Sequence, residues 1–158
     1  MRVEFLLERL DFLADDAPLP LVGGEQGFEV PQGSLDIALD NLSNSLSYDL
    51  DVKSRGSEIA YATYVLARNQ RASAGDLRYF VDTQLEDFDT PLARAQIAAS
   101  LSLYGDPARA ERGFRSALNF AGQVDGHAWS RADYGSRLRD GAAMLALAAE
   151  SRPEPAFV

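Results

Sequence analysis

The 158-residue sequence predicts an all-α fold of antiparallel helical hairpins that form part of an α/α arrangement. Apolar residues recur at helical spacing in seven separate stretches, and most of these stretches carry their own start signal. The connections within residues 56–122 are only a few residues long, so consecutive helices there must run antiparallel. No stretch has a convincing strand pattern. We therefore expect residues 1–158 to form a single helical domain.

The first helix is predicted over residues 3–13, where one stripe is apolar: Val3, Leu6, Leu7, Leu10 and Leu13. Residues 15–33 follow with three prolines and four glycines and little periodicity, which indicates one long loop. A loop of this length in a compact domain is either functional or partly disordered. Ser34 can cap a second helix over residues 35–47, and the polar residues 47–56 are interpreted as a connection.

Four helices are predicted in the central stretch, over residues 58–69, 74–86, 91–104 and 107–121. Ser57 and Ser73 can cap the first two, because a hydroxyl accepts a hydrogen bond from an otherwise unpaired N–H of the first turn. Thr90 and Asp106 each precede a proline, and proline at the first helical position loses no hydrogen bond. Gly105 fits the left-handed position that ends the third of these helices.

The last helix is predicted over residues 131–149, with Ser130 and Asp133 at its start. Five residues are predicted to lie on one face of it: Tyr134, Leu138, Ala142, Leu145 and Ala148. Residues 142–149 are apolar almost all round, which is typical of a helix buried on more than one side. Residues 151–158, with two prolines, are interpreted as a frayed tail.

Composition excludes several classes of function. The net charge of −9 argues against nucleic acid or an anionic membrane as a partner, since both need clustered Lys and Arg. The absence of cysteine excludes a disulfide, a thiolate metal site, a cysteine nucleophile and a thioester within this chain. No run approaches the roughly 20 apolar residues of a transmembrane helix, and the start lacks signal-peptide features. The chain is thus expected to be cytosolic or a piece of something longer.

Two short motifs invite a chemical interpretation. Residues 23–26 read Gly-Gly-Glu-Gln, which resembles the Cys-x-Glu-Gln of internal thioesters, but Gly23 stands at the cysteine position. An ordinary glycine-rich loop is therefore the better interpretation. Glu86, Asp87 and Asp89 could together bind a hard cation or supply an acid and a base. Because the spacing of a calcium loop is missing, we favour a solvated junction between helices.

The remaining polar candidates lie near the end of the chain. His127 is the only histidine, and without a nucleophile in a recognisable turn it is interpreted as a loop residue. Trp129 is expected to pack over the ends of the hairpins. Four charged residues alternate with apolar ones on the last helix: Arg131, Arg137, Arg139 and Asp140. They could face a partner, but a solvated face with an Arg137–Asp140 pair is favoured. We predict no catalytic residue, hydrolase activity, metal site or cofactor.

Two stretches resemble the helical domain of the bacterial alpha-2-macroglobulin-like proteins. They are AYATYVLARNQRASAGDLRYFVDTQLEDFDTPLARAQIAASLSLYGDPARAERGF (60–114) and ADYGSRLRDGAAMLALAAE (132–150). The resemblance implies part of the thioester-domain region, an α/α toroid of inner and outer helices. It also implies a large periplasmic or envelope-anchored parent that traps proteases, with the thioester residues upstream of the matching segment. The partners implied are the neighbouring domains of that parent and, through it, proteases.

Two other classes of protein stay open. A tetratricopeptide-like adaptor would bind a peptide in a groove, and residues 108–118 have some character of its second helix, although its Trp-Leu-Gly-Tyr pattern is missing. An α/α-toroid enzyme such as a glycoside hydrolase needs two carboxylates about 5–10 Å apart in one cavity. The acidic residues here stand mostly at caps and in loops, which disfavours the enzyme.

Seven helices are too few to close the toroid that the resemblance implies. An open arc would leave the apolar flank of its terminal hairpin without a neighbour, and soluble monomers rarely expose large apolar patches. We therefore expect either a homodimer through Leu138 and Leu145 or cover by the helix at 3–13, which also carries Phe5 and Phe12.

Overall fold

The computed structural model describes residues 31–48, 51–123 and 136–151, and these ranges are helical with short connections. The elements are α2 (Gln32–Tyr48), α3 (Val52–Arg68), α4 (Ala74–Tyr79), the π-helical turn η1 (Phe80–Gln84), the 3₁₀ turn η2 (Leu85–Asp87), α5 (Pro91–Leu103), α6 (Pro107–Gln123) and α7 (Arg137–Ser151). The all-α prediction is confirmed for this part of the chain. The predicted helix at 3–13 lies outside it, as do most of the loop at 15–33 and the first residues of the last helix.

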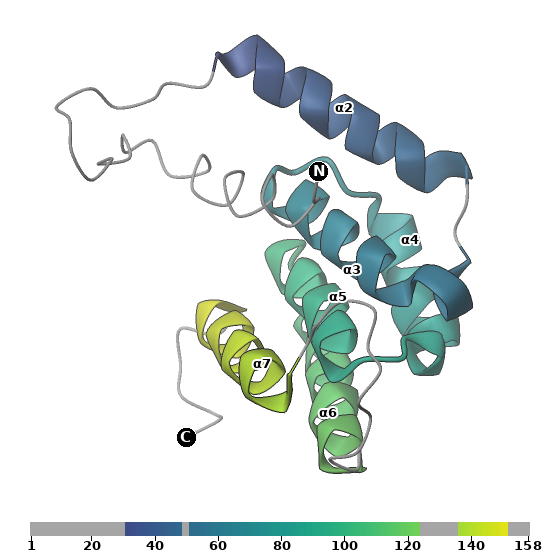
Figure 1. The fold of residues 1–158 in the computed structure, drawn as a ribbon, viewed down its shortest axis with the longest axis vertical. Helices are drawn as coiled ribbons and strands as arrows, with labels where there is room; N and C mark the ends of the chain where they lie inside the picture. Colours follow the sequence, from purple (N-terminus) through teal and green to yellow (C-terminus); the bar gives the residue numbers. More distant parts are fainter. Residues whose placement is uncertain (1–30, 49–50, 124–135, 152–158) are drawn as a thin grey trace, which may run out of the picture.

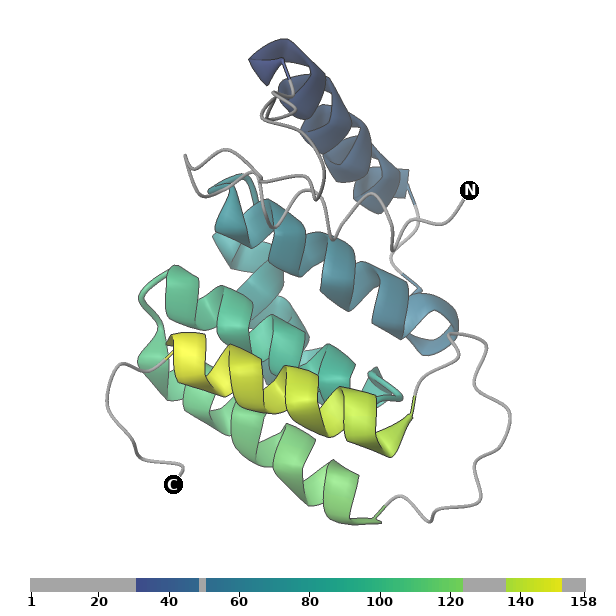
Figure 2. The ribbon, with the colours of Figure 1, turned by 60° about the vertical axis from the view of Figure 1, so that its left-hand side comes forward.

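Helix α5 lies at the centre of the fold. Helix α3 packs on one side of it, α6 and α7 pack on the other, and α2 lies outermost against α3 (Figures 1 and 2). Because α5 packs against several neighbours, ten of its thirteen residues are buried, and half of these ten are alanine or serine. None of the helices in the described part of the chain is both long and apolar enough to cross a membrane.

The largest side chains of the core gather between α3, α5 and the turns after α4. Phe80 and Phe88 meet edge to face, with ring centroids 5.7 Å apart and an interplanar angle of 88°, which is a favourable aromatic geometry. Ile59 from α3 and Ile97 from α5 are fully buried in the same cluster. This cluster fixes the η1–η2 segment against the two helices.

Helices α5 and α6 approach each other closely where Gly113 crosses Ala98. A Cβ atom built at Gly113 would lie 2.8 Å from the Cβ and 3.3 Å from the Cα of Ala98. Side-chain carbons in ordinary contact lie about 3.5–4.0 Å apart. The crossing therefore requires glycine on α6 and a small residue on α5.

Three of the four predicted caps of the central helices are present, those at Ser73, Thr90 and Asp106. The Thr90 hydroxyl accepts from the Ala93 N–H at 3.1 Å, and the Ser73 hydroxyl accepts from the Asp76 N–H at 3.3 Å. Asp106 accepts from the first-turn N–H of Arg109 at 3.3 Å. Gly105 has a φ of 71°, which is the left-handed conformation expected at the end of α5.

The start of α3 corrects the prediction. The helix begins at Val52, within the residues interpreted as a polar connection, and Asp51 caps it by accepting from the Lys53 N–H at 3.2 Å. Val52 is buried in the core, and its burial stabilises the helical conformation of the polar residues that follow it. Ser57 is an internal residue of α3, and its hydroxyl lies 3.2 Å from that of Thr90. The backbone at Arg55 leaves helical geometry (φ −131°, ψ 25°) and kinks the helix near the predicted start.

Two other helices also differ from the prediction. Residues 74–86 were expected to form one α-helix. The α-helix ends at Tyr79, and the chain continues as the π-helical turn η1 and the 3₁₀ turn η2. Helix α7, which was expected to be buried on more than one side over residues 142–149, is buried on one side: Met144 and Leu147 are buried, whereas Leu138 is 85% exposed and Leu145 is 65% exposed. A helix that is apolar almost all round gives no periodic signal for which side packs.

Candidate interaction surfaces

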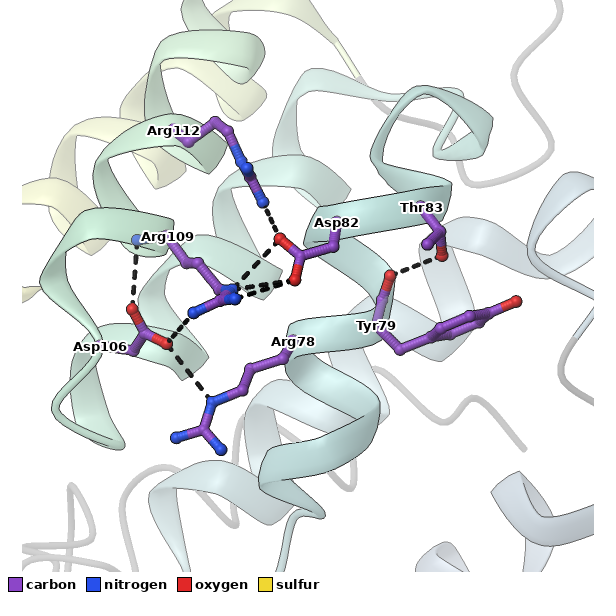
Figure 3. A network of polar contacts seen from close by, with 7 residues as sticks. All are labelled: Arg78, Tyr79, Asp82, Thr83, Asp106, Arg109 and Arg112. Atoms are coloured by element: carbon purple, nitrogen blue, oxygen red, sulfur yellow. Dashed lines mark hydrogen bonds and ion pairs between the residues drawn. The ribbon is translucent and has the colours of Figure 1, made fainter.

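A network of charged side chains joins η1 to the start of α6 (Figure 3). Asp82 accepts from Arg109, whose Nε lies 3.1 Å from both carboxylate oxygens and whose Nη2 lies 3.0 Å from one of them. Asp82 also accepts from Arg112. Asp106 accepts from Arg109 Nη1 at 3.0 Å and from Arg78 Nε at 3.4 Å. We call these five residues the arginine network.

Electrostatics within the arginine network are mutually reinforcing. Hydrogen bonds from Arg109 and then Arg112 hold the pKa of Asp82 below its usual value. Hydrogen bonds to Asp82 and then Asp106 raise the pKa of Arg109. Partial burial opposes ionisation of Asp106, but its contacts with Arg109 and Arg78 still leave its pKa lowered. Because these groups lie at the surface, salt screens them and each pair contributes little to stability.

The π-helical turn places Asp82 so that its carboxylate points toward α6 (Figure 3). Within the turn, the Thr83 hydroxyl donates to the carbonyl of Tyr79 at 2.7 Å. Single π turns inside helices occur often at functional positions. Here the turn connects two helices through the contacts of Asp82 with Arg109 and Arg112.

Arg94 is a buried cation that sequence reasoning missed. The residue is 8% exposed. Its Nε donates to the carbonyl of Phe88 at 3.0 Å, and its Nη2 donates to the carbonyl of Glu86 at 3.1 Å. Nη1 donates to the hydroxyl of Ser116 at 2.9 Å, and the guanidinium carbon lies 4.1 Å from the centroid of the Phe120 ring. Burial lowers the pKa of Arg94. The side chain thus ties the η2 segment to α6.

The acidic residues singled out after α4 point to different neighbours. Asp87 pairs with Lys53 at 3.7 Å, the Glu86 backbone carbonyl binds Arg94, and the side chains of Glu86 and Asp89 are in solvent-exposed residues. In the part of the chain that the structure describes, no three His, Asp or Glu side chains are grouped as metal ligands would be. Residues 23–26, His127, Trp129 and Arg131 lie outside the described residues.

Helices α6 and α7 form an apolar groove of about 310 Å³. Its lining comes from α6 (Phe114, Leu118, Ala121), from α7 (Arg137, Asp140, Gly141, Met144, Leu145, Ala148) and from Pro91. At its edge Asp140 is buried and accepts from its neighbour Arg139, with Nη2 at 3.1 Å, rather than from Arg137 as predicted. Apolar grooves bind apolar ligands or helices, so this groove is a candidate binding surface.

Comparison with known proteins connects this fold to longer chains. No family model matches the chain. It is 33% identical over 141 residues to the alpha-2-macroglobulin of Escherichia coli (strain K12), and 32% identical over 142 residues to that of Xylella fastidiosa (strain Temecula1). In both cases the match covers 84% of this chain and 8% of the relative. The chain therefore spans only a small part of the curated relatives that it matches.

Solved structures give the same result. The native conformation of E. coli alpha-2-macroglobulin matches with a TM-score of 0.71 and 30% identity, over 94% of this chain and 9% of that chain. Trypsin-activated E. coli alpha-2-macroglobulin matches with a TM-score of 0.68 and 30% identity, over 94% of this chain and 10% of that chain. Salmonella alpha-2-macroglobulin reacted with methylamine matches with a TM-score of 0.70 and 32% identity, over 94% of this chain and 10% of that chain. The chain therefore belongs to the bacterial alpha-2-macroglobulin family, as a homologue of one segment of those much longer proteins.

Proposed function

We propose that this chain is a non-catalytic helical domain of an alpha-2-macroglobulin-like protein that traps proteases. The observation that carries the proposal is the 33% identity to the E. coli protein over most of this chain. Related structures include one activated by trypsin and one activated by porcine elastase, which supports proteases as the targets of the parent. On this proposal the chain is part of the α/α toroid in the thioester-domain region, in the periplasm or cell envelope.

The domain contributes a scaffold rather than chemistry. Without cysteine it cannot supply the sulfur of a thioester. The interactions that dominate the described residues are structural: the tight α5–α6 crossing at Gly113, the buried cation Arg94 and the arginine network. The matched structures include native and trypsin-activated forms, with nearly equal TM-scores of 0.71 and 0.68. This supports a domain that keeps its internal fold while its surroundings change.

A segment exchange tests the proposal. The matching segment of E. coli alpha-2-macroglobulin is replaced by this chain, and retention of trypsin by the hybrid is compared with retention by the unaltered protein. A matched hybrid carrying Gly113→Leu serves as control, because a large side chain cannot fit at the Ala98 crossing. We expect the first hybrid to retain trypsin and the control to lose this ability. A folded first hybrid that retains no trypsin would contradict the proposal.

A peptide-binding adaptor is the alternative favoured by one observation, the apolar groove between α6 and α7. Such an adaptor would bind an isolated helical peptide, whereas a domain of a larger protein would be inactive by itself. The enzyme alternative is weaker, because a glycoside hydrolase needs two carboxylates in one cavity and, among the described residues, Asp140 is the one carboxylate that lines this groove.

A further inference from the structure

Helix α2 lies at the edge of the fold, and little of its surface is buried (Figures 1 and 2). Among its residues whose exposure the structure describes, only Leu39 is buried, whereas α3 and α5 each bury ten residues. Leu39 packs in one cluster with Val65 and Leu66 of α3. Three more leucines of α2 pack against this cluster: Leu35, Leu42 and Leu46. Two other clusters hold α3 to α5 and α5 to α6 and α7, so most of their contacts can remain when those of α2 are lost.

The sequence of α2 forms a helix poorly by itself. Its 17 residues include one glycine, two asparagines and four serines. Such residues have low helix propensity, partly because short polar side chains compete for backbone hydrogen bonds. The hydroxyls of Ser45 and Ser47 donate in this way to the carbonyls of Leu42 at 2.8 Å and Ser43 at 3.1 Å. Isolated helices of a few turns are marginal in water even for favourable sequences. Helix α2 is therefore expected to be helical only while it packs on α3.

One arginine binds both charged residues of α2. Asp36 and Asp40 are the only charged residues within Gln32–Tyr48, and they lie one turn apart on the same side of the helix. Arg71 donates from Nη2 to Asp36 at 2.6 Å and from Nη1 to Asp40 at 2.5 Å. We call these three residues the Arg71 clamp. Without Arg71, two ion pairs are lost and two like charges at i and i+4 repel each other.

The backbone before Arg71 has an unusual conformation. Gln70 has a φ of 57°, in the left-handed region that residues other than glycine adopt rarely. The Arg71 N–H donates to the carbonyl of Leu66 at 2.8 Å, and the Gln70 N–H donates to that of Ala67 at 3.0 Å. These bonds close the end of α3 and fix the backbone of Arg71 to it. The clamp thus extends from a preorganised end of α3, which lowers the entropy cost of holding α2.

We propose that α2 is a releasable helix and that the Arg71 clamp controls its docking on α3. On release α2 loses its helical structure, and Val65 and Leu66 lose their contact with Leu39, while α3 to α7 stay folded. Salt favours release, because the carboxylates and the guanidinium of the clamp are exposed enough to be screened. The inference concerns contacts within this chain and does not depend on the proposed function.

Hydrogen exchange of the 158-residue chain tests this inference, because each helix reports its own opening. Exchange in peptides of α2 and of α5 is measured by mass spectrometry in the same sample. We expect the amides of α2 to be at least about tenfold less protected than those of α5. Arg71→Met should speed exchange in α2 by about two- to thirtyfold, the effect of losing two exposed ion pairs. Arg115→Met is the matched control, because Arg115 pairs with Glu111 within α6, and it should leave exchange in α2 unchanged.

Two further measurements separate release of α2 from unfolding of the whole chain. Ile97→Val weakens a core that is folded both before and after release. It should therefore speed exchange in α5 by about two- to tenfold and leave exchange in α2 unchanged. Sodium chloride raised from about 0.05 M to about 0.5 M should speed exchange in α2 of the unaltered chain. In Arg71→Met the same salt should not speed it, because the repulsion between Asp36 and Asp40 is then what salt screens.

Three results would overturn the inference. Equal protection of α2 and α5 in the unaltered chain would show that α2 opens only when the whole chain unfolds. Equal acceleration of exchange in both helices by Ile97→Val would show the same. Equal exchange in α2 of Arg71→Met and Arg115→Met would show that the clamp does not control docking. Where Arg71→Met does not fold, the absence of a salt effect on α2 of the unaltered chain would show this instead.

Discussion

Replacing Gly113 by alanine tests the closest helix contact of the fold. The new Cβ would lie 2.8 Å from the Cβ of Ala98, so α5 and α6 must separate by about 0.7 Å to reach an ordinary contact near 3.5 Å. Overpacking of this kind costs about 1–3 kcal/mol. Alanine recovers about 1 kcal/mol through its higher helix propensity. The expected net loss is therefore about 0–2 kcal/mol.

A substitution at a second glycine of α6 serves as a control, because it gains the same helix propensity without a close contact. Gly122 has no atom within 4 Å of an added Cβ, so Gly122→Ala should leave stability unchanged or raise it by up to about 1 kcal/mol. The free energy of unfolding of each variant is measured by urea denaturation followed by circular dichroism. We expect Gly113→Ala to be about 1–3 kcal/mol less stable than Gly122→Ala, which is the overpacking cost. Equal stability of the two variants would refute the close crossing.

Three further predictions concern single side chains. Arg94→Met should destabilise the chain by about 1–3 kcal/mol, because two backbone carbonyls lose their donor. Arg115→Met at an exposed position is the control. Equal destabilisation by the two substitutions would contradict the role assigned to Arg94. Because the pKa of Asp82 is lowered in the folded chain, its ionisation stabilises the fold above the unfolded pKa of about 4, and this stabilisation is lost as the pH falls further. Asp82→Asn should thus flatten the dependence of the unfolding free energy on pH below about pH 4, and an unchanged slope would contradict the network. Leu147→Asp should destabilise the chain by a few kcal/mol, because it places a charge at a buried position. Leu145→Asp in the chain alone should change stability by less than about 0.5 kcal/mol, because Leu145 is exposed. Thermal melting of the two variants decides which face of α7 is buried.

Local chemistry made the central helices predictable from sequence. Thr90 caps α5 and Gly105 ends it because each acts through backbone atoms within a few residues. The start of α3 was missed for the opposite reason. Its residues are polar except Val52, and the contact that decides their conformation is burial of that valine against residues far along the chain. A contact between residues so far apart in sequence forms only in the folded protein, so the local sequence does not predict this helix start.

The candidate surfaces were less predictable than the helices. The exposed face of α7 could not be derived, since Leu145 and Leu147 are equivalent in a helix that is apolar on every side. Arg94 carried no signal, because its partners are backbone carbonyls and a hydroxyl rather than a carboxylate at helical spacing. The hydrogen bond from Arg109 to Asp82 likewise joins residues 27 positions apart, and it depends on a π turn that no residue pattern predicts.

The central position of α5 has a consequence for how the chain folds. Helices α5 and α6 are joined by residues 104–106 alone, so the Ala98–Gly113 contact closes one of the shortest loops in the structure. Contacts of α5 with α3 and α7 close longer loops and form at a greater cost in chain entropy. The α5–α6 hairpin is therefore expected to be formed early, at the transition state. Substitutions at Gly113 should accordingly slow refolding, whereas substitutions at Leu147 should mainly speed unfolding.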